Sequence, residues 1–260
     1  MMSDMNPLID QICEYWNAHI HDLAMTDHPV GSLEFFDDLD EYRFDKLRYL
    51  PVAVDFDGYQ DRALIEVGCG IGTDLLRFAR GGAAVTGVDL ATRSIDLARA
   101  NFALHGLSDA ADWRVANGEA LPFADGTFDV VYAHGVLQYT ADPARMVNEC
   151  RRVLKPGGEA IFMVYNRYSW LSVLSTLTRV GLEHGDAPAL RLFSIGEYRR
   201  LLRDFSEVRI VPERFPVPSR LHEGWRGAVY NGIFVRAFDV LPRSWVRSLG
   251  WHLMAFCRIK

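Results

Sequence analysis

The sequence predicts an α/β domain in which a mostly parallel sheet carries helices on both faces. Short apolar runs alternate with helical patterns between residues 61 and 165, an order typical of strand–helix–strand units. A glycine-rich turn, Gly68–Gly72, follows the first apolar run, and such turns join a strand to a helix in parallel sheets. The length of 260 residues is enough for one large domain.

The elements follow from hydrophobic spacing and from start and stop signals. Residues 1–60 are predicted to be helical, and an apolar stripe in their second half has near-helical spacing: Leu33, Phe36, Leu39, Tyr42 and Phe44. Seven apolar runs are predicted strands: Ala63–Val67, Ala84–Asp89, Asp112–Ala116, Phe128–Ala133, Glu159–Tyr165, Glu207–Pro212 and Trp251–Cys257. Predicted helices fill the stretches between them: from Gly72 through Arg80, Ser94–His105, Asp142–Lys155, Asn166–Ala189 and Ser194–Asp204.

An insertion, Phe215–Arg247, separates the last two predicted strands. Tyr230, Phe234 and Phe238 lie four residues apart in it, so they fall on one helical face. Three interpretations of this stripe stay open: a buried helix face, a cover over a hydrophobic substrate, and contact with a membrane surface.

Composition excludes several classes of protein. The net charge is −6, although residues 1–62 hold 14 acidic and 4 basic side chains and residues 191–260 hold 6 acidic and 13 basic ones. An acidic chain is a poor candidate for general nucleic-acid binding. The four cysteines form no paired motif, which argues against a zinc site or disulfide framework. The sequence has no signal peptide pattern and no apolar run of membrane-spanning length, so we expect a cytoplasmic protein.

The glycine loop leaves two ligands to distinguish. A dinucleotide fingerprint would place glycine where Thr73 stands. Glu66, just before the loop, would repel a pyrophosphate but attract an ammonium group. Asp89 ends the second strand, 21 residues after Gly68, where a carboxylate can accept from ribose hydroxyls. These residues favour the second kind of ligand, which has no pyrophosphate and is bound by the backbone of the loop and by carboxylates.

With these residues in place, the chain resembles the class I S-adenosylmethionine-dependent methyltransferases, in particular the small-molecule group that includes the quinone-biosynthesis C-methyltransferases. The resemblance rests on four segments in the family's order, LIEVGCGIGTDLLRFA, VTGVDLATRSIDLARA, NGEALPFADGTFDVVYAHGVLQY and ECRRVLKPGG, within residues 63–165. It implies a Rossmann-like, doubly wound sheet of seven strands with an antiparallel last strand. It also implies a helical lid at residues 1–60, a methyltransferase domain at 61–260 and a cover insertion at about 213–247.

The resemblance also implies a role for individual residues. Glu66, Gly68, Cys69 and Gly70 would surround the methionine part of S-adenosylmethionine, and the backbone carbonyl of Ala133 would lie near its ammonium group. The ribose and adenine would be held by the remaining cofactor residues: Asp89, Leu90, Asn117, Gly118 and Glu119. Asparagine at 117 departs from the aspartate that is frequent in the family, yet its carbonyl can still accept from the adenine amine.

Residues that would contact the acceptor carry weaker signals. His134 directly follows the fourth strand and is the candidate general base, with a structural histidine as the alternative, and Tyr139 could orient a substrate or pack in a helix. An aromatic and histidine cluster near the N-terminus would form a lid or substrate wall: Tyr15, Trp16, His19 and His21. No metal is expected, because the histidines there lack a completing ligand set.

The predicted function is transfer of a methyl group to a small organic acceptor by in-line displacement. A small-thiol S-methyltransferase and a non-catalytic sensor or partner subunit that binds the cofactor are the alternatives. The expected partners are the small acceptor and, as an open alternative to a monomer, a second copy of the chain; neither nucleic acid nor an integral membrane association is expected.

Overall fold

The fold is built on one seven-stranded sheet. The computed structural model describes residues 6–178, 184–217, 232, 235–242 and 246–260. The strands follow the order β3-β2-β1-β4-β5-β7-β6 across the sheet. Their bounds are β1 Ala63–Val67, β2 Ala84–Asp89, β3 Ala111–Val115, β4 Phe128–His134, β5 Leu154–Tyr165, β6 Glu207–Glu213 and β7 His252–Arg258. Strands β1 to β5 pair in parallel, and β7 runs antiparallel to both β5 and β6. The predicted fold class, including the antiparallel last strand, is confirmed.

Side-chain alternation divides the core between the two faces of the sheet. In β1, Leu64 joins one hydrophobic cluster and Ile65 joins the other, and Val130 and Val131 of β4 divide in the same way. The first cluster contains residues of α4 (Thr73–Arg80) and α5 (Thr92–Leu104), and the second those of α6 (Pro143–Val153) and α8 (Ile195–Leu201). The sheet therefore carries helices on both faces, because both faces are apolar.

The predicted start signals of two helices, α6 and α8, are confirmed, and the predicted end of α6 is two residues too late. Asp142 caps α6 through the backbone amides of its first turn, and Ser194 with Glu197 forms the capping box of α8. Helix α6 ends at Val153 rather than Lys155, because Leu154 already pairs with Phe128 as the first residue of β5.

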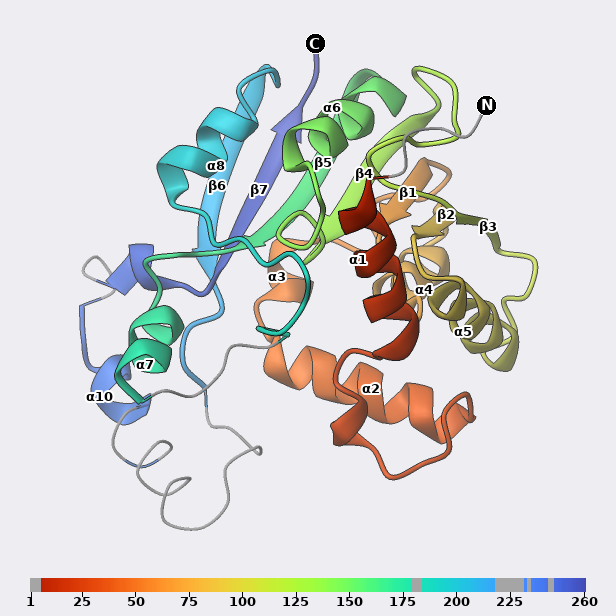
Figure 1. Ribbon diagram of the computed structural model, residues 1–260. Coiled ribbons are helices and arrows are strands. Elements are labelled where there is room, and N and C mark those ends of the chain that lie inside the picture. Colours follow the sequence, from red (N-terminus) through yellow and green to blue (C-terminus); the bar gives the residue numbers. More distant parts are fainter. Residues whose placement is uncertain (1–5, 179–183, 218–231, 233–234, 243–245) are drawn as a thin grey trace.

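Residues 6–60 contain α1 (Pro7–Ala18), η1 (Leu23–Met25), α2 (Leu33–Lys46) and α3 (Leu50–Ala53). Both α1 and α2 contact α5, and Figure 1 shows α2 crossing below the lower end of α1. The apolar stripe of α2 differs from the prediction by part of a turn. Phe35, Phe36 and Leu39 are buried, whereas Leu33 is 38% exposed. Leu33 is the first residue after the Ser32 cap, so it lies at the open end of the helix.

The segment after β5 is less helical than predicted. Within the predicted helix Asn166–Ala189, α7 covers Trp170–Thr178, and residues 184–188 form turns and bends. Of the predicted aromatic stripe, Phe238 is buried on α10 (Val235–Asp239), while Tyr230 and Phe234 lie outside the described residues. A short helix, η3 (Arg247–Leu249), precedes β7. Across the described ranges, no helix is both long and apolar enough to cross a bilayer.

Candidate active site

A cavity of about 240 Å³ lies at the carboxyl ends of the central strands. Its wall includes the Gly68 loop after β1, Asp89 at the end of β2 and His134 at the end of β4. Strands β1 and β4 are neighbours, but the chain leaves β1 toward β2 on the other side, so the cavity lies at the switch point of the sheet. Ligands of open α/β sheets bind at such points.

Glycine is required at position 68 because the loops after β1 and β4 touch there. Gly68 has a φ of +75°, and a Cβ on it would lie 2.3 Å from Cγ2 of Val136. The amides of Gly68 and Cys69 both donate to the carbonyl of Val88, at 2.7 and 3.0 Å. The loop is therefore fixed against β2, with its backbone open to the cavity.

Asp89 anchors the same loop from β2. Its Oδ2 accepts from the Gly70 amide at 3.0 Å, and its Oδ1 accepts from the Ala91 amide at 2.8 Å. Burial raises the pKa of Asp89, and these amides oppose the shift. Each carboxylate oxygen has a second lone pair, so Asp89 can hold the loop and still accept from two ribose hydroxyls.

Glu66 faces the cavity with one oxygen that lacks a partner. The residue is 4% exposed, and its Oε2 makes no hydrogen bond within the described structure. Burial, followed by the charge of Asp74, raises the pKa of Glu66 well above its usual value, although Arg43 acts in the opposite direction. A buried carboxylate oxygen without a donor is costly, and an ammonium group in the cavity would supply that donor. The residues present thus fit the methionine end of S-adenosylmethionine.

The residues expected around adenine also line the cavity. Asn117 Oδ1 accepts from the Glu119 amide at 2.9 Å, and Leu90 accepts at its carbonyl from Cys13 Sγ of α1 at 3.4 Å. Gly118 is packed closely, since a Cβ there would lie 2.9 Å from Cγ1 of Val67. Glu119 lines the cavity, yet its Oε1 accepts from Thr140 Oγ1 and the Asp142 amide, at 2.5 and 2.9 Å.

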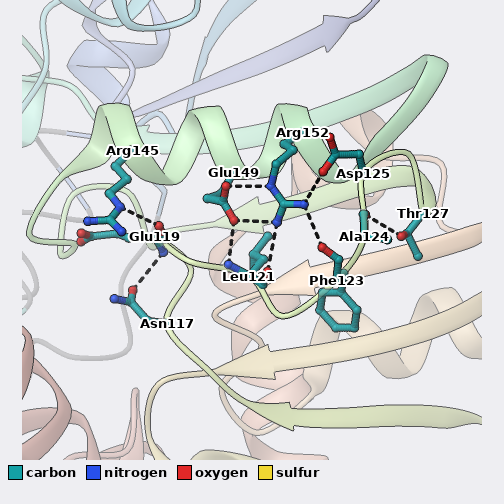
Figure 2. A network of polar contacts seen from close by, with 10 residues as sticks. All are labelled: Asn117, Glu119, Leu121, Phe123, Ala124, Asp125, Thr127, Arg145, Glu149 and Arg152. Atoms are coloured by element: carbon teal, nitrogen blue, oxygen red, sulfur yellow. Dashed lines mark hydrogen bonds and ion pairs between the residues drawn. The ribbon is translucent and has the colours of Figure 1, made fainter. Parts of the chain in front are cut away.

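A polar network fixes this segment onto α6, and Figure 2 shows its side chains. Arg145 Nε donates to the carbonyl of Glu119 at 3.0 Å. Glu149 accepts from the Leu121 amide at 2.9 Å, and Arg152 donates to the carbonyls of Leu121 and Phe123 at 3.0 and 2.8 Å. The chain between β3 and β4 has no helix of its own, so α6 supplies its hydrogen-bond partners.

Of two further residues predicted to contact the cofactor, Cys69 lies in the cavity wall and Ala133 does not. Cys69 lines the cavity, and burial raises the pKa of its thiol well above the usual value. Ala133 is fully buried in the cluster that contains α6 and is not part of the cavity wall; the residues that follow it, His134 to Val136, are.

His134 lies in the cavity wall with both ring nitrogens engaged. Its Nδ1 faces Arg43 Nη2 at 3.2 Å, and its Nε2 faces Tyr49 Oη at 3.0 Å. Burial, followed by the charge of Arg43, lowers the pKa of His134 to about 3, so the ring is neutral at physiological pH. Since arginine only donates, Nδ1 must accept and Nε2 must carry the proton.

The same chain of contacts continues to β7. Tyr49 Oη lies 2.6 Å from His252 Nδ1, and His252 Nε2 faces Arg214 Nη1 at 3.1 Å. By the same argument His252 Nδ1 carries the proton, so the Tyr49 oxygen accepts from both imidazoles. Its own hydroxyl faces Met254 Sδ at 3.9 Å. Four residues of this chain of contacts were not predicted from the sequence: Arg43, Tyr49, Arg214 and His252. They come from parts of the chain that are far apart, namely residues 43–49, 214 and 252, and they carry no local motif.

The N-terminal cluster is divided between the cavity and its surroundings. Trp16, His19 and His21 line the cavity, and the Trp16 and Tyr139 rings meet edge to face with centroids 5.2 Å apart. Tyr15 instead donates to Asp186 Oδ1 at 2.9 Å. Among the described residues, no three His, Cys, Asp or Glu side chains are grouped so that they could hold a metal ion.

The sequence comparisons agree with this geometry. Residues 65–162 match a family model described as "Methyltransferase domain". A sterol 4-C-methyltransferase of Caenorhabditis elegans is 40% identical over 102 residues, 39% of this chain and 30% of that protein. A ubiquinone biosynthesis O-methyltransferase of Cereibacter sphaeroides is 35% identical over 154 residues, 59% of this chain and 60% of that protein. The chain therefore spans less than two thirds of either relative.

The solved structures show the same fold over a longer range. A geranyl diphosphate C-methyltransferase of Streptomyces coelicolor superposes with a TM-score of 0.63 at 20% identity, covering 98% of this chain and 99% of that one. A methyltransferase of Thermotoga maritima superposes with a TM-score of 0.59 at 21% identity, covering 87% of this chain and 98% of that one. Residues 65–162 of this chain thus resemble a methyltransferase domain in sequence, and the described fold is the one that these two solved methyltransferases share.

Proposed function

We propose that the chain transfers a methyl group from S-adenosylmethionine to a small organic acceptor by direct in-line displacement. The observation that carries this proposal is Glu66 Oε2, which is buried in the cavity wall beside the Gly68 loop and has no hydrogen-bond partner among the described residues. Such an oxygen requires a hydrogen-bond donor, and the ammonium group of the methionine part would supply one. The relatives' names support small acceptors, since they mention a sterol and ubiquinone biosynthesis.

When bound, S-adenosylmethionine supplies a methyl group on a sulfonium that is already electrophilic. The chain's residues have to bind the cofactor, align the acceptor with the methyl–sulfur bond and exclude water. Glu66 would take the ammonium group and Asp89 the ribose hydroxyls. Helix α1 would act as the lid, since it supplies Ile12 and Trp16 to the cavity wall. Asn17 Oδ1 accepts from the Arg93 amide at 3.1 Å, which holds the end of this helix to α5.

His134 and Tyr139 remain the proposed residues on the acceptor side. Both line the cavity. With Nδ1 accepting from Arg43 and Nε2 donating to Tyr49, His134 offers no vacant nitrogen for an acceptor's proton, so its proposed role is to shape and polarise the wall. Tyr139 packs edge to face against Trp16 of α1 and would orient the acceptor beneath the lid.

The test combines binding with turnover. Calorimetry with S-adenosylhomocysteine should give saturable binding, and Asp89→Ala should weaken it at least about tenfold because a charge-assisted hydrogen bond is lost. Labelled S-adenosylmethionine is then offered with phenols, carbon acids and thiols. Turnover on thiols alone would favour the S-methyltransferase, and binding without turnover on any acceptor would favour the sensor. Absence of binding would contradict the whole proposal.

A further inference from the structure

Two contacts hold the end of α1 to different parts of the chain. Asn17 Oδ1 accepts from the Arg93 amide of α5 at 3.1 Å. Tyr15 Oη donates to Asp186 Oδ1 at 2.9 Å and lies 3.1 Å from His184 Nδ1. We call the second contact, formed by Tyr15, His184 and Asp186, the clasp. In Figure 1 the segment that carries His184 and Asp186, which precedes α8, lies beside α1.

The direction of both hydrogen bonds in the clasp follows from Asp186. A carboxylate only accepts, so the hydroxyl hydrogen of Tyr15 is used for Asp186, and the Tyr15 oxygen must accept from His184 Nδ1. Burial, followed by the hydrogen bond to Asp186, raises the pKa of Tyr15 to about 12. The same hydrogen bond lowers the pKa of Asp186. The phenol therefore stays protonated and the carboxylate ionised at physiological pH, as the clasp requires.

The segment that carries His184 and Asp186 is anchored to the loop after β4. The Arg191 amide donates to the carbonyl of Gln138 at 2.9 Å, and Arg191 Nη2 donates to the carbonyl of Ala141 at 2.9 Å. His184 has a φ of +49°, in the left-handed region that side-chain-bearing residues seldom adopt. Such a conformation persists where the surrounding structure enforces it. The partners of Tyr15 thus form a fixed base for the clasp.

The clasp lies next to a residue of the cavity wall. Trp16 follows Tyr15 on α1 and lines the cavity. The centroid of its ring lies 4.9 Å from that of His184 and 5.2 Å from that of Tyr139, which also lines the cavity. The clasp and the loop after β4 therefore hold Trp16 between them, and displacing this part of α1 would break the contacts of both Tyr15 and Trp16.

The clasp is more exposed than the contact that holds α2. Arg43 of α2 pairs with Asp74, and the two side chains are 19% and 1% exposed. Asp186, in contrast, is an exposed residue. Hydrogen bonds between exposed groups stabilise a contact only modestly, whereas separating a buried charge pair is costly. We therefore expect α1 to open more readily than α2.

We propose that α1 is a lid closed by the clasp, so that a bound cofactor is released when the bonds from Tyr15 to Asp186 and His184 open. This inference rests on the proposed function, because it takes α1 to cover a bound cofactor. Methyl transfer needs a site without water, and release of the product S-adenosylhomocysteine needs an open one. A weak contact at the edge of the lid satisfies both needs.

Hydrogen–deuterium exchange of the ligand-free protein tests the clasp without the cofactor. Tyr15→Phe removes both hydrogen bonds and keeps the ring, so the amides of α1 should exchange at least about threefold faster. Asp186→Ala removes one bond and should give a smaller increase. Asp186→Asn should change little, because its amide oxygen still accepts from Tyr15. Tyr168→Phe is the matched control, since it makes the same change at a tyrosine that is 63% exposed and outside the cavity wall.

Stopped-flow measurements with S-adenosylhomocysteine test the effect on release. Tyr15→Phe should speed its dissociation at least about threefold, and Tyr168→Phe should leave both the dissociation and the exchange of α1 unchanged. Unchanged exchange of α1 in Tyr15→Phe, faster exchange with unchanged dissociation, or equal effects of Tyr168→Phe would overturn the proposal. If S-adenosylhomocysteine does not bind the unmodified protein, the proposed function fails, and the exchange of α1 alone decides whether Tyr15 holds this helix closed.

Discussion

Arg43 of α2 donates two hydrogen bonds to the carboxylate of Asp74 of α4, from Nε to Oδ1 at 2.6 Å and from Nη2 to Oδ2 at 2.5 Å. Tyr132 of β4 donates to the same carboxylate at 2.8 Å, and Arg43 also reaches His134. Burial opposes ionisation of Asp74, but Arg43 outweighs it and lowers the pKa below the usual value. The N-terminal helices are thus bound to the sheet domain by a charge pair in the wall of the cavity.

Removing one partner of this pair should lower the stability of the folded protein more than removing both partners. Arg43→Met leaves the Asp74 charge buried without its partner, so we expect a loss of about 3–5 kcal/mol in the free energy of unfolding. Arg43→Met combined with Asp74→Asn removes both charges and should recover most of that loss. Urea denaturation measures both values. A double variant as unstable as the single one would contradict the assignment of a buried, mutually dependent pair.

Glu66 should limit the stability of the ligand-free protein at neutral pH. Its pKa is raised in the folded state, so the folded protein holds this proton more tightly than the unfolded chain does. The resulting stability is present below the unfolded pKa of about 4.5 and is lost as the pH rises through the folded value. Glu66→Gln should therefore stabilise the ligand-free protein at pH 8, by on the order of 1 kcal/mol, and should have little effect at pH 4.

The same variant should weaken cofactor binding. An amide does not replace the charge that an ammonium requires, so the affinity for S-adenosylhomocysteine should fall at least about tenfold. In the unmodified protein this affinity should rise with pH as Glu66 ionises, and Glu66→Gln should remove that dependence. Calorimetry across the pH range checks both statements, and an unchanged pH profile in the variant would assign the effect to another group.

The side of the cavity that would hold the cofactor was predictable because its chemistry is local in sequence. Glu66, Gly68 and Asp89 belong to strand ends and a glycine turn, and the strand β1 and its neighbour β2 have the predicted bounds. The side of the cavity that contains His134 and His252 depends on tertiary contacts instead. Arg43 and Arg214 lie far apart in the chain and follow no motif, so only the folded chain shows that both reach the cavity.

Arg152 should affect the affinity for the cofactor without contacting the cofactor itself. It donates to the carbonyls of Leu121 and Phe123 and pairs with Glu149, and these contacts hold the segment that contains Asn117. Arg152→Met would leave the carbonyls without their donor and should cost about 1–3 kcal/mol of stability. We expect the affinity for S-adenosylhomocysteine to fall several-fold as the segment loosens. Arg151→Met is the control, because Arg151 is the exposed neighbour on the same helix. Equal losses in the two variants would remove the case for a positioning role.

His134 should make the protein sensitive to acid without setting the pH dependence of turnover. Its pKa is about 3 in the folded protein and near 6.5 in the unfolded chain. Between these two pH values the unfolded chain binds a proton at His134 and the folded protein does not. The stability it contributes is present above pH 6.5 and is lost as the pH falls toward 3. Stability measured between pH 7 and pH 4 should therefore fall less steeply in His134→Ala than in the unmodified protein. If turnover is obtained, its profile should lack an inflection near pH 6.5 that His134→Ala removes. Such an inflection would show that His134 exchanges a proton with the acceptor, and that the contacts from Arg43 and Tyr49 open during the reaction.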